Sequence, residues 1–150
     1  MTALMFALLL FGSHGPEVQR YSVKPWVFTV RQDRFTGAKT CTAKARGVRL
    51  DGDRLTFDLG HYVENAEAVY RLDDGAAQKL SALPSDAVYR ESFHFDPGKD
   101  GHLAFFSLAD VAGVRKLSIR SADHRPVSSF DLSALPKLLD GEKGAGCPGL

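Results

Sequence analysis

The stretch that decides the fold is WVFTVRQDRFTGAKTCTAKARGVRLDGDRLTFDL, residues 26–59. Apolar side chains recur at every second position from Trp26 to Val30, which is the period of a strand with one buried face. Turn-forming residues at 33–37 separate this strand from a second alternating segment around Cys41. The pattern predicts an antiparallel hairpin.

Two further hairpins follow from the same alternation. The segments 48–50 and 55–59 flank an Asp-Gly-Asp turn at 51–53, and Asp-Gly favours the tight turn that joins two strands. The segments 68–72 and 76–80 flank a second acidic turn that also ends in glycine.

The rest of the chain extends the same pattern. We expect a fourth hairpin from 88–95 and 102–108, then strands at 114–120 and 127–132. Short strands at this spacing predict an all-β fold, an antiparallel β-sandwich or barrel-like sheet of about 8–10 strands. One short C-terminal helix is expected to begin at a Ser133 cap, run through Leu139 and stop at Gly141.

Length and composition predict one domain without a charged global field. The chain has 150 residues, 44% of them hydrophobic, including ten Phe, which is enough for one core. Its net charge of +1 gives no general attraction to nucleic acid or anionic membranes. We therefore expect no nucleic-acid partner.

The N-terminus predicts export. An apolar run covers Ala3–Phe11 and is followed by small residues, as in a secretory signal. The run is shorter than the roughly 20 residues that a helix needs to cross a bilayer, so no integral membrane span is expected. We assign residues 1–15 to a signal peptide and 16–150 to a single β-sandwich domain, in the periplasm or outside the cell. A buried N-terminal strand or helix is the alternative.

The cysteines support the same compartment. An exported chain with two cysteines has one possible internal pairing, Cys41 to Cys147. This bond would anchor the glycine-rich C-terminal tail. The alternative is a pair of reduced thiols in a cytosolic protein.

A metal site is one candidate for chemistry. If 88–95 pairs with 102–108, cross-strand register places His94 and His102 on the same outer face. Two imidazoles with a nearby carboxylate could bind zinc. The candidate ligands are His94, Asp96, Asp100 and His102. An ordinary polar hairpin face explains the same residues, so no cofactor is assigned.

Arginines in the first hairpins give a candidate interaction patch, which a protein or envelope component could contact. They are Arg31, Arg34, Arg46, Arg49 and Arg54. A solvated outer face is the alternative. No nucleophile elbow or phosphate-binding glycine loop is present, so no catalytic residue is assigned.

The order of motifs resembles a known family. Trp26-Val27-Phe28, a Thr-Gly turn and Cys41 are followed by the phrase VYRLDDG at 69–75 and by FDL at 130–132 before the last Cys. This order is similar to the invasion-associated locus B family of small periplasmic proteins of alphaproteobacteria. The resemblance implies an envelope location and a role in interaction or stress.

The leading interpretation is an exported, non-enzymatic interaction module of unknown ligand. A metal-dependent enzyme using His94 and His102 is one alternative, and a structural envelope protein or inhibitor is another. The sequence leaves the oligomeric state open.

Overall fold

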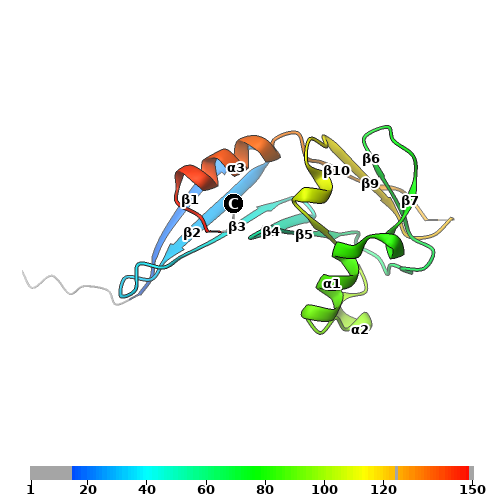
Figure 1. Ribbon diagram of the computed structural model, residues 1–150, viewed down its shortest axis with the longest axis horizontal. Coiled ribbons are helices and arrows are strands. Elements are labelled where there is room, and N and C mark those ends of the chain that lie inside the picture. Colours follow the sequence, from blue (N-terminus) through cyan, green and yellow to red (C-terminus); the bar gives the residue numbers. More distant parts are fainter. Residues whose placement is uncertain (1–14, 124, 149–150) are drawn as a thin grey trace, which may run out of the picture.

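The computed structural model describes residues 15–123 and 125–148, and two antiparallel sheets form its framework (Figure 1). The six-stranded sheet has the order β1-β2-β3-β4-β5-β8 and the four-stranded sheet the order β10-β9-β6-β7. The strands are β1 (Glu17–Val23), β2 (Trp26–Gln32), β3 (Lys39–Ala45), β4 (Val48–Asp51), β5 (Arg54–Asp58), β6 (Val69–Leu72), β7 (Gln78–Lys79), β8 (Leu103–Ser107), β9 (Lys116–Arg120) and β10 (Ser128–Asp131). The expected all-β, sandwich-like fold is confirmed.

Helical elements connect and cover these strands. They are the 3-10 turns η1 (Leu80–Ala82) and η2 (Ala109–Val111) and the helices α1 (Pro84–Ser92), α2 (Pro97–Asp100) and α3 (Leu135–Gly144). No helix in the described parts of the chain is long and apolar enough to cross a membrane. The expected signal peptide falls, except for its last residue, outside the described residues.

The three hairpins expected from alternation are present as β2–β3, β4–β5 and β6–β7. In β2, Trp26, Phe28 and Val30 are buried, while the residues between them are not. The turn after β2 is held by Asp33, whose side chain accepts the backbone N–H groups of Phe35 and Thr36. Local turn chemistry therefore fixes the register that alternation predicts.

Strand β1 was not expected from the sequence. It pairs with β2 along its whole length at the edge of the six-stranded sheet. Six of its seven residues are exposed. Because an exposed edge strand needs no apolar alternation, this segment lacks the pattern that identified the other strands.

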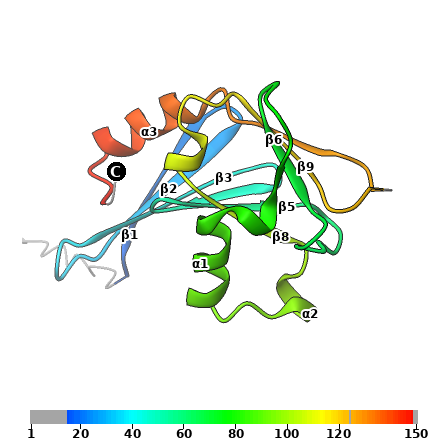
Figure 2. The same ribbon diagram turned by 45° about the vertical axis from the view of Figure 1, so that its right-hand side comes forward.

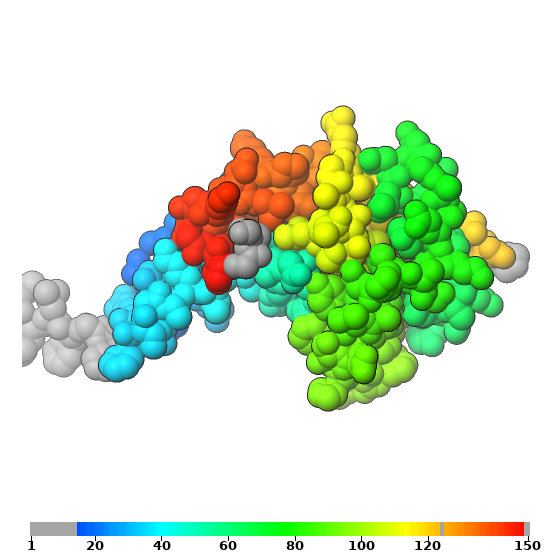
Figure 3. Space-filling model, viewed as in Figure 1, coloured from blue at the N-terminus to red at the C-terminus, as the bar shows by residue number. Residues whose placement is uncertain are grey.

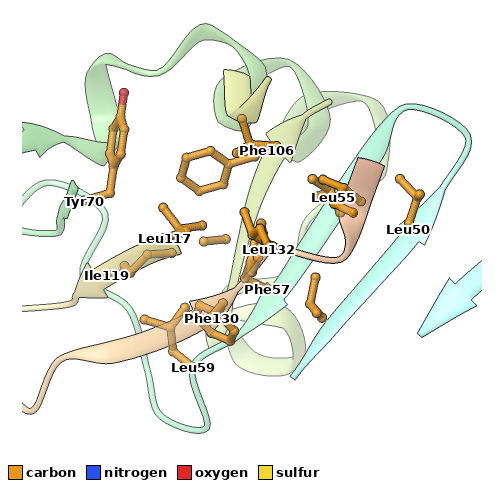
Figure 4. Close-up of a cluster of buried hydrophobic side chains, with 14 of the residues drawn as sticks. Leu50, Leu55, Phe57, Leu59, Tyr70, Phe106, Leu117, Ile119, Phe130 and Leu132 are labelled. Atoms are coloured by element: carbon orange, nitrogen blue, oxygen red, sulfur yellow. The ribbon is translucent and has the colours of Figure 1, made fainter. Parts of the chain in front are cut away.

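The core lies between the inner face of the six-stranded sheet and two different covers. The four-stranded sheet covers one half, where Phe57 packs edge-on against Phe106 and Phe130 (Figure 4). The Tyr70 ring also meets Phe106, with ring centroids 5.2 Å apart. Helix α3 covers the other half and contacts β1 and β2 (Figures 1 and 2).

The disulfide fastens this second cover. Cys41 of β3 is bonded to Cys147, just after α3, as the sequence predicted. The Lys39 ammonium donates to the backbone carbonyl of Ala145 at 2.9 Å. Covalent and polar contacts thus hold the C-terminal segment on the β3 side of the sheet.

The expected helix at the C-terminus is present with different ends. Ser133 does not cap it, because its N–H and hydroxyl both donate to the Asp131 carboxylate. The cap position is Ala134, and the helix continues past Gly141. At Gly141 a side-chain β-carbon would lie 3.4 Å from the Phe28 ring, so glycine allows close packing here rather than ending the helix.

The expected fourth hairpin is wrong in its first half. Residues 84–92 form α1, and β8 pairs with β5 rather than with 88–95. Pro84 stands in the first turn of α1, where its missing N–H costs no hydrogen bond. The one buried residue of α1 is Asp86, and polar contacts from Asp86 and Arg90 to the backbone of β8 hold the helix beside that strand.

Candidate functional site

The candidate site is a hollow on the outer face of the six-stranded sheet. It has a volume of about 390 Å³ and lies between the sheet and the segment that joins α1 to α2. In the space-filling view α1 and α2 form a lobe that projects from the lower side of the molecule (Figure 3). The lining includes Arg49, Asp51, Arg54, Thr56, Phe93 and Phe105, and we call it the Arg54–Phe93 hollow.

Its floor is an ion-pair ladder across β4 and β5. Arg49 donates to both carboxylate oxygens of Asp51, at 2.6 and 3.0 Å. Arg54, directly opposite Asp51 in the register, donates to the same carboxylate at 3.3 Å. The hydrogen bond that Arg49 donates to Asp51 raises the pKa of the Arg49 guanidinium. Arginine side chains in proteins stay charged. Asp100 also lines the hollow, so the charges of the two arginines are balanced by two carboxylates.

The wall is supplied by Phe93 and Phe95. The Arg54 guanidinium carbon lies 3.9 Å from the centroid of the Phe93 ring, a cation–π contact. Phe93 is 55% exposed, so one side of its ring remains open to a ligand. His94, with φ of 48°, turns the chain between the two phenylalanines. As a result, Phe93 stacks on Arg54 and Phe95 stacks on Arg90.

Arg90 of α1 holds this wall in place. It pairs with the buried Asp86 at 2.6 Å and donates to the backbone carbonyl of Leu103 on β8 at 2.9 Å. Its guanidinium carbon also lies 4.2 Å from the Phe95 ring centroid. Tyr89 lies beside both Phe93 and Phe105, and burial raises its pKa, with a further contribution from Asp53. The hollow is therefore built on packed elements rather than on a loose loop.

This chain matches no family model, no curated protein and no solved structure. The arrangement of its own residues is therefore the basis for assigning a function. The guanidinium of Arg54 stacks on one side of the Phe93 ring, and the other side is open. Such a pair can bind a ligand that combines an apolar group with a hydrogen-bond acceptor.

The predicted arginine patch is only partly assembled. Arg49 and Arg54 meet at Asp51, as described above. Arg34 lies in the turn after β2 and Arg46 in the turn after β3, so these two stand at opposite ends of β3. Arg31 is exposed on β2, opposite Thr40. The structure thus brings two of these arginines into one site and spreads the others along the sheet.

The predicted metal ligands do not converge. His94 follows α1, whereas Asp96 caps α2 and accepts the N–H of Gly98. Asp100 accepts the N–H of Asp96, and His102 lies 3.9 Å from Asp58 instead. Because 88–95 is not a strand, the register that would place His94 opposite His102 does not exist. Within the described residues, no group of three or more His, Cys, Asp or Glu side chains is arranged to hold a metal ion.

A serine–histidine contact was missed by the sequence analysis. The Nε2 atom of His61 lies 2.9 Å from the hydroxyl of Ser121. Ser121 is only 1% exposed, so a substrate could not reach its oxygen. This geometry satisfies a buried hydroxyl group and does not form an accessible nucleophile.

The sequence analysis also missed the part that Phe93 and Asp86 play. Phe93 belongs to the segment 88–95 that was expected to be a strand, Asp86 lies just before it, and their partners lie on β5 and β8. The spacing of Asp86 and Arg90 by four residues, after Pro84, was the available signal for a helix with an internal ion pair.

Proposed function

We propose that this protein is an exported, non-enzymatic interaction module that acts in the periplasm or outside the cell. The Cys41–Cys147 disulfide is the observation that carries the proposal. Disulfides persist in oxidising compartments and are rare in the reducing cytosol. The resemblance in motif order to the invasion-associated locus B family points to the same compartment.

The Arg54–Phe93 hollow is the surface we assign to binding. Arg and aromatic side chains are enriched at the centres of protein interfaces, where rigid anchors lose little entropy on binding. Arg54 is held by Asp51 and Phe93, and Phe93 is half exposed. The Nε atom of Arg54 is buried and has no hydrogen-bond partner among the described residues. A protein partner that presents an acidic or amide side chain next to an apolar one fits this surface.

The compartment is tested by thiol counting on native protein. We expect no titratable thiol before reduction and two after reduction in denaturant, together with a new N-terminus near residue 15. Two free thiols and an intact initiator methionine in native material would overturn the proposed export.

The surface is tested by quantitative capture from an envelope extract. An immobilised Phe93→Ala, Arg54→Ala double variant is compared with wild type and with Arg46→Ala, which removes an exposed arginine in the turn after β3. We expect the double variant to recover at least tenfold less of one captured protein than wild type does. Arg46→Ala should recover as much of that protein as wild type. Equal recovery by all three proteins would exclude the hollow as the binding surface.

A further inference from the structure

A second hollow lies on the outer face of the four-stranded sheet. Its volume is about 340 Å³, and β6, β9 and β10 all contribute to its lining. The polar part of that lining consists of Arg71, Lys116, Ser118, Arg120 and Ser129, which we call the Ser118 face. Both the elements and the residues differ from those of the Arg54–Phe93 hollow.

The strand register gathers these side chains around Ser118. Arg71 of β6 is directly opposite Ser118 on one side, and Ser129 of β10 is opposite it on the other. Lys116 and Arg120 stand two residues before and after Ser118 on β9. Facing residues are about 5 Å apart and alternate residues of a strand about 7 Å apart, so three cations surround one hydroxyl group.

All of these side chains point away from the core. Leu117 and Ile119, which alternate with them on β9, are fully buried against the inner side. The cations are therefore displayed together on one face, and the hydroxyl groups of Ser118 and Ser129 lie 3.3 Å apart between them.

Much of the hydrogen-bonding capacity of this face is unused. Arg71 donates only its Nε to the Gly75 carbonyl, which leaves its terminal nitrogens unengaged by other described residues. Arg120 pairs through one terminal nitrogen with Asp123, and the Lys116 ammonium has no ion pair within the described residues. These donors can serve an acceptor supplied from outside.

One carboxylate on this face, that of Asp131, is already engaged in hydrogen bonds. Asp131 is opposite Lys116 in the register, but its Oδ1 accepts both the N–H and the hydroxyl of Ser133. These hydrogen bonds lower the pKa of Asp131, so it stays charged and would repel an anion placed on its side of Lys116. An anion is therefore favoured beside Arg71 and Ser118, away from Asp131 and from Asp123, which already pairs with Arg120.

We propose that the Ser118 face binds a phosphate-type oxyanion. Such a group accepts several hydrogen bonds at once, which matches guanidinium donors on two strands and a hydroxyl group between them. The hollow also includes Val69, Ala77 and Val127, and Val127 is 58% exposed. The oxyanion would therefore be one end of a ligand with an apolar neighbouring part. This site goes beyond the proposed protein-binding surface and does not depend on it.

The site is tested by titrating the full chain with inorganic phosphate at constant ionic strength. Binding is monitored through the amide chemical shifts. We expect saturable shifts at Ser118, Arg120 and Ser129, and at least tenfold weaker binding in a Lys116→Gln, Arg120→Gln double variant. Arg71→Gln, which leaves β9 intact, is the second variant in case the first does not fold. Arg46→Gln, on the other sheet, is the control and should bind phosphate as wild type does.

A second arm distinguishes the source of the phosphate. Co-sedimentation with vesicles of phosphatidylglycerol, compared with phosphatidylcholine vesicles, tests a phosphodiester carried on a lipid. Binding of phosphate alone would assign a free or polymer-borne group, and binding of phosphatidylglycerol vesicles that Arg71→Gln abolishes would assign a lipid headgroup. Shifts that Arg46→Gln weakens equally, or no binding in either arm, would overturn the site whatever the result at the Arg54–Phe93 hollow.

Discussion

The Asp86 carboxylate accepts the backbone N–H of Phe105 at 2.9 Å, although the two residues belong to a helix and an edge strand. Arg90, one helical turn later, donates to the carbonyl of Leu103 on the same strand. Side chains of α1 thus satisfy backbone N–H and carbonyl groups at the free edge of β8. The backbone of a neighbouring strand would otherwise do this. Open edges promote aggregation, and this ion pair closes one of them.

Replacement of Asp86 by Ala should therefore be strongly destabilising. It leaves the Phe105 N–H unsatisfied and the Arg90 guanidinium without its buried partner, which costs about 3 kcal/mol or more. Urea unfolding measures the loss, and hydrogen exchange should show a faster Phe105 amide. Glu91→Ala, at an exposed position of α1, is the matched control and should change stability little. If both variants unfold at the same urea concentration, the edge is not closed by Asp86.

The disulfide should contribute a large part of the stability. Cys41 and Cys147 are separated by 106 residues, and closing a loop of that size stabilises a fold by about 5 kcal/mol in the chain-entropy model. A Cys41→Ser, Cys147→Ser double variant should therefore melt well below wild type. Calorimetry with and without reductant checks this, since reductant should affect wild type and leave the double variant unchanged.

Glu142 should make stability depend on pH. It is 3% exposed, and burial raises the pKa of its carboxyl from 4.5 to about 7. Between those values the folded protein holds a proton that the unfolded chain has released, so stability falls as the pH rises from about 4.5 to 7 and then levels off. The total loss is on the order of 3 kcal/mol.

Glu142→Gln tests this linkage. The variant should lose this decline and be more stable than wild type at pH 8, as measured by urea unfolding across the pH range. Asp140→Asn, at an exposed position of the same helix, should retain the wild-type profile. A Glu142→Gln curve parallel to that of wild type would assign the pH dependence to other groups.

Two glycines with the same backbone conformation provide a matched pair. Gly47 and Gly37 have φ of 71° and 72°, which disfavours any other residue by roughly 1 kcal/mol. A β-carbon at Gly47 would lie 3.1 Å from the Phe130 ring, whereas none of the described atoms lies within 4 Å at Gly37. Gly47→Ala should therefore cost more than Gly37→Ala in thermal melts. Equal costs would mean that Phe130 shifts freely.

The strands that could be predicted from the sequence are those that combine alternation with a turn signal. In β4 and β5 the buried residues alternate on both sides of Asp-Gly-Asp, so local chemistry alone fixes the hairpin. Strand β1 could not be found this way because it is exposed along most of its length. Helix α1 was mistaken for a strand because its apolar residues are few and its stability depends on Asp86 contacting β8.

The same distinction explains the candidate site. Arg49 and Arg54 could be singled out because they flank a predicted turn. Phe93 could not, since its role depends on α1 packing at the β8 edge of the sheet and bringing Phe93 against Arg54, which is a long-range contact. The His94 and His102 hypothesis failed for the same reason, because it relied on a local pairing that the fold replaces with β5–β8.

The placement of α3 has a consequence for how the polypeptide matures. Trp26 and Phe28 emerge early during synthesis, yet α3, which covers their end of the sheet, is made more than a hundred residues later. Until then the first strands present an apolar surface that invites premature association. A nascent chain of this protein should therefore depend on a holding chaperone until the segment after residue 134 has been made.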